Sequence, residues 1–202
     1  MLKSIKNKLN SYQSVLSAER KESAVLVPLI YINDQLHVLF EVRAKNMRTQ
    51  PLEICFPGGK VESNEHSKET AIRETMEELN LSSEHITIMK DIDPLFTPFN
   101  LVIYPYVGII ENISVRDIKP NEHEVEKVFT VPLEFLIEQE EQVYTITTNF
   151  DIPDDFPFHK IQNGKNYNWK NGTYDVVFYE YDGHIIWGIT AKILRNFLRI
   201  IK

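Results

Sequence analysis

The stretch "FPGGKVESNEHSKETAIRETMEELNL" (residues 56–81) places six glutamates against two lysines and one arginine. Its spacing predicts a tight turn at Gly58-Gly59 and then a helix, with Ser67 as the N-cap and Asn80 in the left-handed conformation that ends it. Like charges one helical turn apart repel each other by a few tenths of a kcal/mol per pair. The carboxylates therefore either form a solvated face or surround a positive group.

The predicted helix has two different faces, because residues three and four apart lie on the same side. Three of its glutamates stand at i, i+3 and i+4 and can direct oxygens at one point, and hard divalent cations take oxygen ligands. Together with glycines that let the backbone approach a ligand, they predict a metal–phosphate cradle. The packing face comprises Ala71, Ile72, Thr75, Met76 and Leu79, and the opposite face comprises Thr70, Arg73, Glu74, Glu77 and Glu78.

The same residues resemble the Nudix box, G-x5-E-x7-R-E-U-x-E-E-x-G-U, where U is a bulky aliphatic residue. Two positions depart from the pattern: Thr75 replaces an aliphatic residue and Asn80 replaces a glycine, and neither departure removes a ligand. The resemblance implies a Nudix-type α/β/α sandwich with a mixed β-sheet, and hydrolysis of a nucleoside diphosphate linked to another group. The matching positions are Gly59, Glu65, Arg73, Glu74, Glu77, Glu78 and Leu81.

Upstream, "LFEVRAKNMRTQPLEICFPGG" (residues 39–59) resembles the motif of Nudix coenzyme A pyrophosphatases, L-L-T-x-R-[SA]-x3-R-x3-G-x3-F-P-G-G. Glu41 stands where that motif has Thr, Phe40 replaces the second Leu, and Leu52 replaces a Gly. With downstream similarity, the resemblance covers about residues 24–198. It implies cleavage of coenzyme A to 4′-phosphopantetheine and adenosine 3′,5′-bisphosphate, with Mg²⁺ or Mn²⁺ as the cofactor.

Two other functions stay open. Pro98 lies near the place where ADP-ribose and sugar-nucleotide pyrophosphatases carry a proline, so such a substrate is the first alternative. The second is a non-catalytic Nudix domain that senses a nucleotide. The complete set of box glutamates argues against it.

The resemblance also implies roles for individual residues. Glu74, Glu77, Glu78 and the Gly59 carbonyl would bind the metal, Arg73 would orient carboxylates, and Glu65 would brace the loop before the helix. A fourth carboxylate from a distant loop, acting as ligand or general base, is expected at Glu124, with Glu122 second; a solvated loop acid is the alternative. Arg43, Arg48 and Lys60 are candidates for binding phosphate, with surface salt bridges as the alternative for the arginines.

The bulk composition suits a single domain with an added element. Residues 1–22 are expected to form an amphipathic helix, with Ile5, Leu9, Tyr12 and Leu16 on one side, packed on a Nudix domain of residues 23–202. The net charge of −7 argues against a broad nucleic-acid or anionic-membrane surface. The Nudix resemblance implies a small-molecule nucleotide as the partner. Nudix proteins often form homodimers, so a homodimer is a further expectation.

The chain has one cysteine, Cys55, which is expected to be a small buried apolar residue of a strand. One cysteine cannot form an intrachain disulfide, and the sequence has neither a secretory h-region nor a run of about 18 apolar residues. We therefore expect a cytoplasmic protein. Other elements are expected as strands at 24–32, 36–42, 53–56, 85–89, 101–110, 143–150 and 172–189, a short strand before a helix from about Leu133, a loop at 151–171, and a C-terminal helix.

Overall fold

The computed structural model describes residues 20–202, together with residues 3, 6 and 10. The side chains expected on the N-terminal helix, those of Ile5, Leu9, Tyr12 and Leu16, lie outside the described residues, so that helix stays a prediction. From Lys21 onward the chain forms the α/β fold that the sequence predicts.

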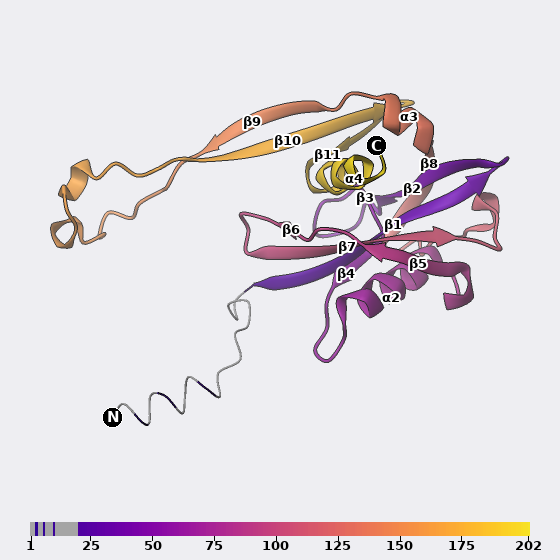
Figure 1. Ribbon diagram of the computed structural model, residues 1–202, viewed down its shortest axis with the longest axis horizontal. Coiled ribbons are helices and arrows are strands. Elements are labelled where there is room, and N and C mark those ends of the chain that lie inside the picture. Colours follow the sequence, from indigo (N-terminus) through magenta and orange to yellow (C-terminus); the bar gives the residue numbers. More distant parts are fainter. Residues whose placement is uncertain (1–2, 4–5, 7–9, 11–19) are drawn as a thin grey trace.

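A mixed, eight-stranded sheet forms the centre of the molecule (Figure 1). β1 (Lys21–Ile32) and β7 (Leu101–Ile110) run parallel beside each other at its middle. Their long apolar runs are typical of strands that are covered on both faces. The main path continues through β2 (Gln35–Arg43) to β3 (Ile54–Cys55) on one side and to β5 (Ile86–Asp91) on the other; β4 (Gly58–Lys60) pairs with β1, β6 (Leu95–Phe96) with β7, and β8 (Val125–Pro132) with β2.

Strand alternation divides the core between the two faces of the sheet. Leu26 and Ile30 of β1 pack with Leu79 of helix α2 (Ser67–Leu79). Val27 and Leu29 belong to the opposite core, which is covered by α3 (Leu133–Glu138) and α4 (Gly188–Ile201). Helices therefore lie on both faces of the sheet, and the predicted α/β/α sandwich is confirmed.

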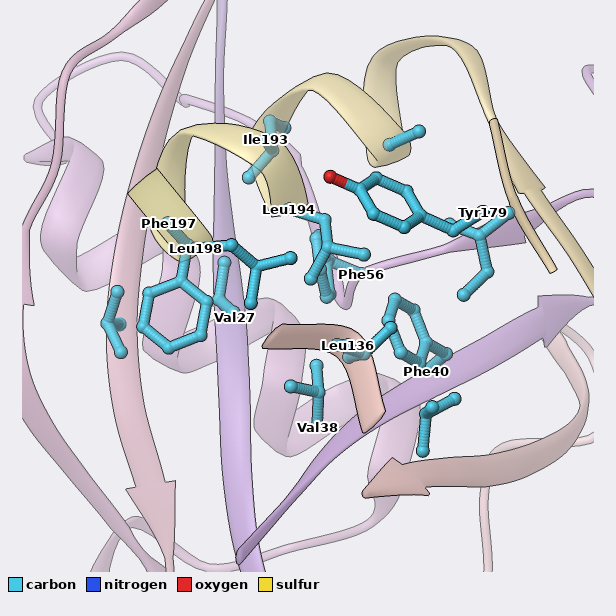
Figure 2. Packing of buried hydrophobic residues seen from close by; sticks show 14 of the residues in the cluster. Val27, Val38, Phe40, Phe56, Leu136, Tyr179, Ile193, Leu194, Phe197 and Leu198 are labelled. Carbon is cyan, nitrogen blue, oxygen red and sulfur yellow. The ribbon is translucent and has the colours of Figure 1, made fainter. Parts of the chain in front are cut away.

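Aromatic and aliphatic side chains fill the core between α4 and the sheet (Figure 2). Phe40 of β2 is fully buried there and stacks on Phe56, with ring centroids 5.0 Å apart. Leu194 and Leu198 of α4 belong to the same core and are buried (Figure 2). This packing fixes the strand-to-turn segment at residues 56–59, which leads into α2 on the other side of the sheet.

A second sheet of three strands carries a long ribbon. β9 (Gln142–Thr148) and β10 (Gly172–Tyr181) extend away from the body, and β11 (His184–Trp187) returns to it (Figure 1). The predicted loop between β9 and β10 contains two short 3₁₀ turns, Phe158–Lys160 and Gly164–Asn166. No helix in the described part of the chain is long and apolar enough to cross a membrane.

Candidate active site

Helix α2 begins one residue away from the predicted cap. The N-cap is His66 and not Ser67, and the Glu69 carboxylate accepts the His66 backbone N–H at 2.9 Å. The Ser67 hydroxyl is instead 2.8 Å from the Tyr106 hydroxyl, so a tertiary contact takes the oxygen that a local cap would use. At the other end Asn80 has φ 50°, which confirms the left-handed residue predicted there.

Two residues of α2 are more buried than helical periodicity predicts. Ala71, Thr75 and Leu79 are buried as expected, but Thr70 and Glu78, placed on the opposite face, are buried as well. For Glu78 the reason is that the Gly-Gly turn lies against this side of the helix, whereas Thr70 donates its hydroxyl to Glu65 at 2.7 Å. The Gly58 N–H donates to Glu78 Oε2 at 2.8 Å, so the turn and the helix hold one another.

Arg73 connects three carboxylates. Its Nε is 2.9 Å from Glu65 Oε1, and its Nη1 is 2.9 Å from Glu74 Oε1 and 3.2 Å from Glu77 Oε2. Glu65 also accepts the Thr70 hydroxyl at 2.7 Å, and the bonds from Arg73 and Thr70 lower the pKa of Glu65 to about 2. Arg73 thus ties the loop before α2 to the acidic side of the helix.

Glu41 of β2 is a buried carboxylate at this site that the sequence reasoning missed. It is 1% exposed, and its Oε1 accepts the Cys55 thiol at 3.2 Å. Cys55 is therefore half-buried and hydrogen-bonded, not the purely apolar strand residue expected. Two signals pointed to Glu41: a charge within an apolar strand, and alternation that puts it on the same face as Leu39, toward α2.

Burial and mutual repulsion shape the electrostatics of these acids. Burial, followed by the charge of Glu41, raises the pKa of Glu78 to about 9, and burial raises the pKa of Glu41 to about 7. Burial is also the main cause of the raised pKa of Glu74. The charge of Glu124 contributes to all three shifts, so this loop residue lies near these acids, whereas Glu122 is exposed.

These shifts predict how the metal-free protein responds to pH. Glu78 and Glu41 bind protons more tightly when folded than when unfolded, so the free energy of unfolding falls as pH rises from about 4.5 through about 9. We expect urea unfolding in EDTA to show lower stability at pH 8.5 than at pH 6. Saturating Mn²⁺ should reduce this difference, and equal stability at both pH values in EDTA would contradict the assignment.

The donor set fits a hard divalent cation. Within residues 20–202 no three acidic, thiol or imidazole side chains stand in ready metal-binding geometry, because Arg73 engages Glu74 and Glu77 while Gly58 holds Glu78. The available donors are nevertheless carboxylate and carbonyl oxygens, the ligands that Mg²⁺ and Mn²⁺ prefer. A Cβ on Gly59 would overlap the Glu74 carboxylate, so only glycine leaves space between backbone and acid.

One cleft opens beside the glycine turn, and a larger cleft adjoins it. The smaller, of about 170 Å³, is lined by Arg43, Cys55, Gly58 and Gly59. It shares Gln50, Glu53, Ile189 and Thr190 with a cleft of about 440 Å³. The larger cleft is mostly apolar, and its aromatic lining residues are Phe99, Tyr174 and Trp187.

The three basic residues predicted to bind phosphate differ in position. Arg43 lines the smaller cleft, and its Nε donates to the Thr49 carbonyl at 3.3 Å. Arg48 is exposed in the loop after β2, and Lys60 is exposed at the end of β4. Only Arg43 of the three lines the clefts beside the Gly-Gly turn.

The NUDIX domain family model matches residues 21–149, which contain the glycine turn, the acidic helix and Glu124. The chain belongs to the Nudix family. This Nudix chain is 34% identical over 125 residues to the mouse peroxisomal coenzyme A diphosphatase NUDT7, covering 60% of this chain and 50% of that protein. It is 26% identical over 188 residues to the human mitochondrial coenzyme A diphosphatase NUDT8, covering 92% and 72%.

A further relative is Nudix hydrolase 3 of Caenorhabditis elegans, 35% identical over 120 residues, covering 57% of this chain and 49% of that one. The chain thus spans about half the length of the worm and mouse relatives. A crystal structure of a MutT/nudix family protein from Enterococcus faecalis has a TM-score of 0.53 at 17% identity, covering 100% of this chain and 70% of that one. This similarity shows that the two proteins share the fold.

Proposed function

We propose that the protein is a pyrophosphohydrolase that uses Mg²⁺ or Mn²⁺ to cleave the diphosphate of coenzyme A or acyl-coenzyme A. The products would be 4′-phosphopantetheine and adenosine 3′,5′-bisphosphate. The observation that carries this proposal is that the glycine turn, which is hydrogen-bonded to Glu78 of the acidic helix, lines a cleft together with Arg43, and that this cleft adjoins a larger apolar one. The coenzyme A diphosphatases among the relatives support the same substrate.

The carboxylates of α2 have the first role in this proposal. Glu74, Glu77, Glu78 and the Gly59 carbonyl would hold the cation, and Arg73 would position Glu74 and Glu77 through its ion pairs. The bound cation would neutralise the diphosphate and lower the pKa of an attacking water. Glu78 would contribute most, because it is the most buried of the three glutamates and already contacts the Gly-Gly turn.

Glu124 is proposed to act on the water, as ligand or general base. We expect Glu124→Gln to lower kcat by about 10²-fold with little change in KM, since general-base catalysis contributes about 10²–10⁴-fold. Glu122→Gln, two residues away and exposed, is the matched control and should turn over as wild type. A fully active Glu124→Gln beside an inactive Glu122→Gln would move the role to Glu122.

Coenzyme A carries a 3′-phosphate and a pantetheine arm, both of which ADP-ribose lacks, and each of the two clefts suits one of these parts. Arg43 would pair with a phosphate, and an arginine–phosphate pair is charge-assisted and often bidentate. The apolar cleft would take the pantetheine arm. Arg48 and Lys60, both exposed, are the further candidates for contacting a phosphate.

Substrate choice gives the test of the proposed function. A partly exposed arginine–phosphate pair is worth about 1–3 kcal/mol, so wild type should prefer coenzyme A to dephospho-coenzyme A by about 5- to 150-fold in kcat/KM. The panel should also include ADP-ribose, NADH and dinucleoside polyphosphates. Arg43→Ala should remove the preference and spare hydrolysis of the dephospho form, and Arg48→Ala is tested beside it.

Two outcomes separate the substrate from the contact. The substrate proposal is falsified if wild type hydrolyses ADP-ribose better than coenzyme A. If coenzyme A is preferred and both arginine variants keep that preference, the phosphate contact lies elsewhere, and Lys60 is the next residue to replace.

Domain limits and location are also proposals. We infer a helical element at residues 1–22, a catalytic unit at 23–202 and a cytoplasmic location, consistent with a chain that holds one cysteine. The names of the mouse and human relatives refer to peroxisomes and mitochondria. Microscopy of the full chain with a C-terminal fluorescent tag would distinguish these compartments.

A further inference from the structure

Glu41 is a buried charged residue that has no part in the chemistry proposed above. Its side chain is 1% exposed, and its Oε2 has no hydrogen-bond partner within the described part of the chain. An unpaired carboxylate in the protein interior is strongly unfavourable unless a positive group or hydrogen bonds compensate it. Glu41 Oε2 is therefore a buried oxygen with neither a hydrogen-bond donor nor a cation beside it in residues 20–202.

The strand places the Glu41 side chain on the face of the sheet that the acidic helix covers. Glu41 alternates with Phe40, which points into the core under α4, and so faces α2 together with Leu39. Its register partner on β3 is Cys55, which precedes the Phe56-Pro57-Gly58 turn. Gly58 in turn binds Glu78 at 2.8 Å. Among charged neighbours, Glu41 is the one that acts most strongly on Glu78.

We propose that Glu41 Oε2 is an additional oxygen ligand for the divalent cation held by the glutamates of α2. The Cys55 thiol, which donates to Oε1 at 3.2 Å, would hold the carboxylate with Oε2 toward the cation. Coenzyme A pyrophosphatases have Thr at the corresponding position of the motif quoted above, so the ligand would be particular to this chain. The inference rests on the proposed metal dependence but not on the choice of substrate.

If Glu41 had a purely structural role, its second oxygen would need a hydrogen-bond partner. A neutral, structural carboxylic acid would donate its proton to an acceptor or accept a bond at its second oxygen. Residues 20–202 provide no such partner for Oε2. A cation placed among Glu41, Glu74, Glu78 and Glu124 would compensate all four acids at once.

The experiment measures Mn²⁺ binding to the full chain without substrate, by titration calorimetry and by the electron paramagnetic resonance of free Mn²⁺. Glu41→Gln should weaken Mn²⁺ binding by about tenfold or more, the scale typical of altered metal surroundings. Glu41→Asp keeps the charge but withdraws the oxygen by one methylene, and it should weaken binding as well. Glu122→Gln removes an exposed carboxylate and should bind as wild type.

Several results would overturn the assignment. Wild-type affinity in Glu41→Gln would show that the carboxylate is structural, and wild-type affinity in Glu41→Asp would show that only its charge acts. A metal-free melting temperature at or above that of wild type should accompany the loss in Glu41→Gln, which excludes unfolding as its cause. Cys55→Ala, which leaves Glu41 intact, should also weaken Mn²⁺ binding, and this keeps the test available if the Glu41 variants fail to fold.

The two proposals fail separately. If wild type binds Mn²⁺ in a Glu41-dependent way but does not cleave coenzyme A, the substrate is wrong and the ligand stands. If it cleaves coenzyme A while the Glu41 variants bind Mn²⁺ normally, only the ligand is wrong. No Mn²⁺ binding by wild type would overturn the ligand directly.

Discussion

Glu78→Gln should fold as wild type does and lose at least about 10²-fold in kcat, because one negative charge is removed from the cation site. The substitution keeps the side-chain length, and the glutamine carbonyl can still accept the Gly58 N–H that Glu78 accepts at 2.8 Å. Helix propensity is nearly unchanged. Steady-state hydrolysis of coenzyme A at saturating Mg²⁺, with circular dichroism as the test of folding, measures the effect.

The same substitution should not destabilise the metal-free protein, although it lowers kcat. Burial raises the pKa of Glu78 to about 9, so in EDTA at pH 8 the wild type must bury or protonate an acid that Gln replaces at no such cost. Glu78→Gln should therefore melt at or above the wild-type temperature in EDTA, and gain less than wild type from Mn²⁺. Glu69→Gln, an exposed acid in the first turn of α2, is the control and should keep wild-type turnover. Unchanged turnover in Glu78→Gln would remove Glu78 from the site.

Gly58→Ala should lower the free energy of unfolding by about 3 kcal/mol or more, since overpacking and backbone strain each cost about 1–3 kcal/mol. Gly58 has φ 157°, and a Cβ there would overlap the Ala24 carbonyl oxygen and lie 2.6 Å from Val25 Cα. Both contacts are with the backbone of β1, which its neighbours hold at the middle of the sheet. The turn cannot move away without losing its bond to Glu78.

Urea unfolding in EDTA measures this loss apart from any effect on metal. Gly183→Ala is the matched control, because Gly183 has φ 75° but no atom within 4 Å of an added Cβ. Gly183→Ala should lower the free energy of unfolding only by the cost of the left-handed backbone conformation, about 1 kcal/mol. If both variants lose the same stability, the close approach of Gly58 to β1 has no energetic consequence.

Patterns within single segments predicted most of the fold. Apolar runs rich in strand-forming residues identified β1 and β7, and alternation identified β2. The helical period identified α2 and α4, because such periods follow from local backbone geometry. The spacing of Glu74, Glu77 and Glu78 predicted an acidic site for the same reason, and Asn80 ends the helix as expected. The α/β/α arrangement of the layers was predicted from the resemblance to the Nudix box, because periodicity within one segment does not show how segments are layered.

Tertiary structure decided what depends on contacts between distant segments. Glu41 and Glu78 are 37 positions apart in sequence, and they meet because β2 lies beside β1 and α2 covers that face. The turn at Gly58 buries Glu78 on a helix face that periodicity alone leaves in solvent. Glu124 likewise lies near these acids because the loop before β8 meets the end of β2, where the Glu124 carbonyl accepts the Ala44 N–H at 2.8 Å. Local periods specify which residues share a face, but strand register and crossovers specify which faces meet, and those come only from packing of the whole chain.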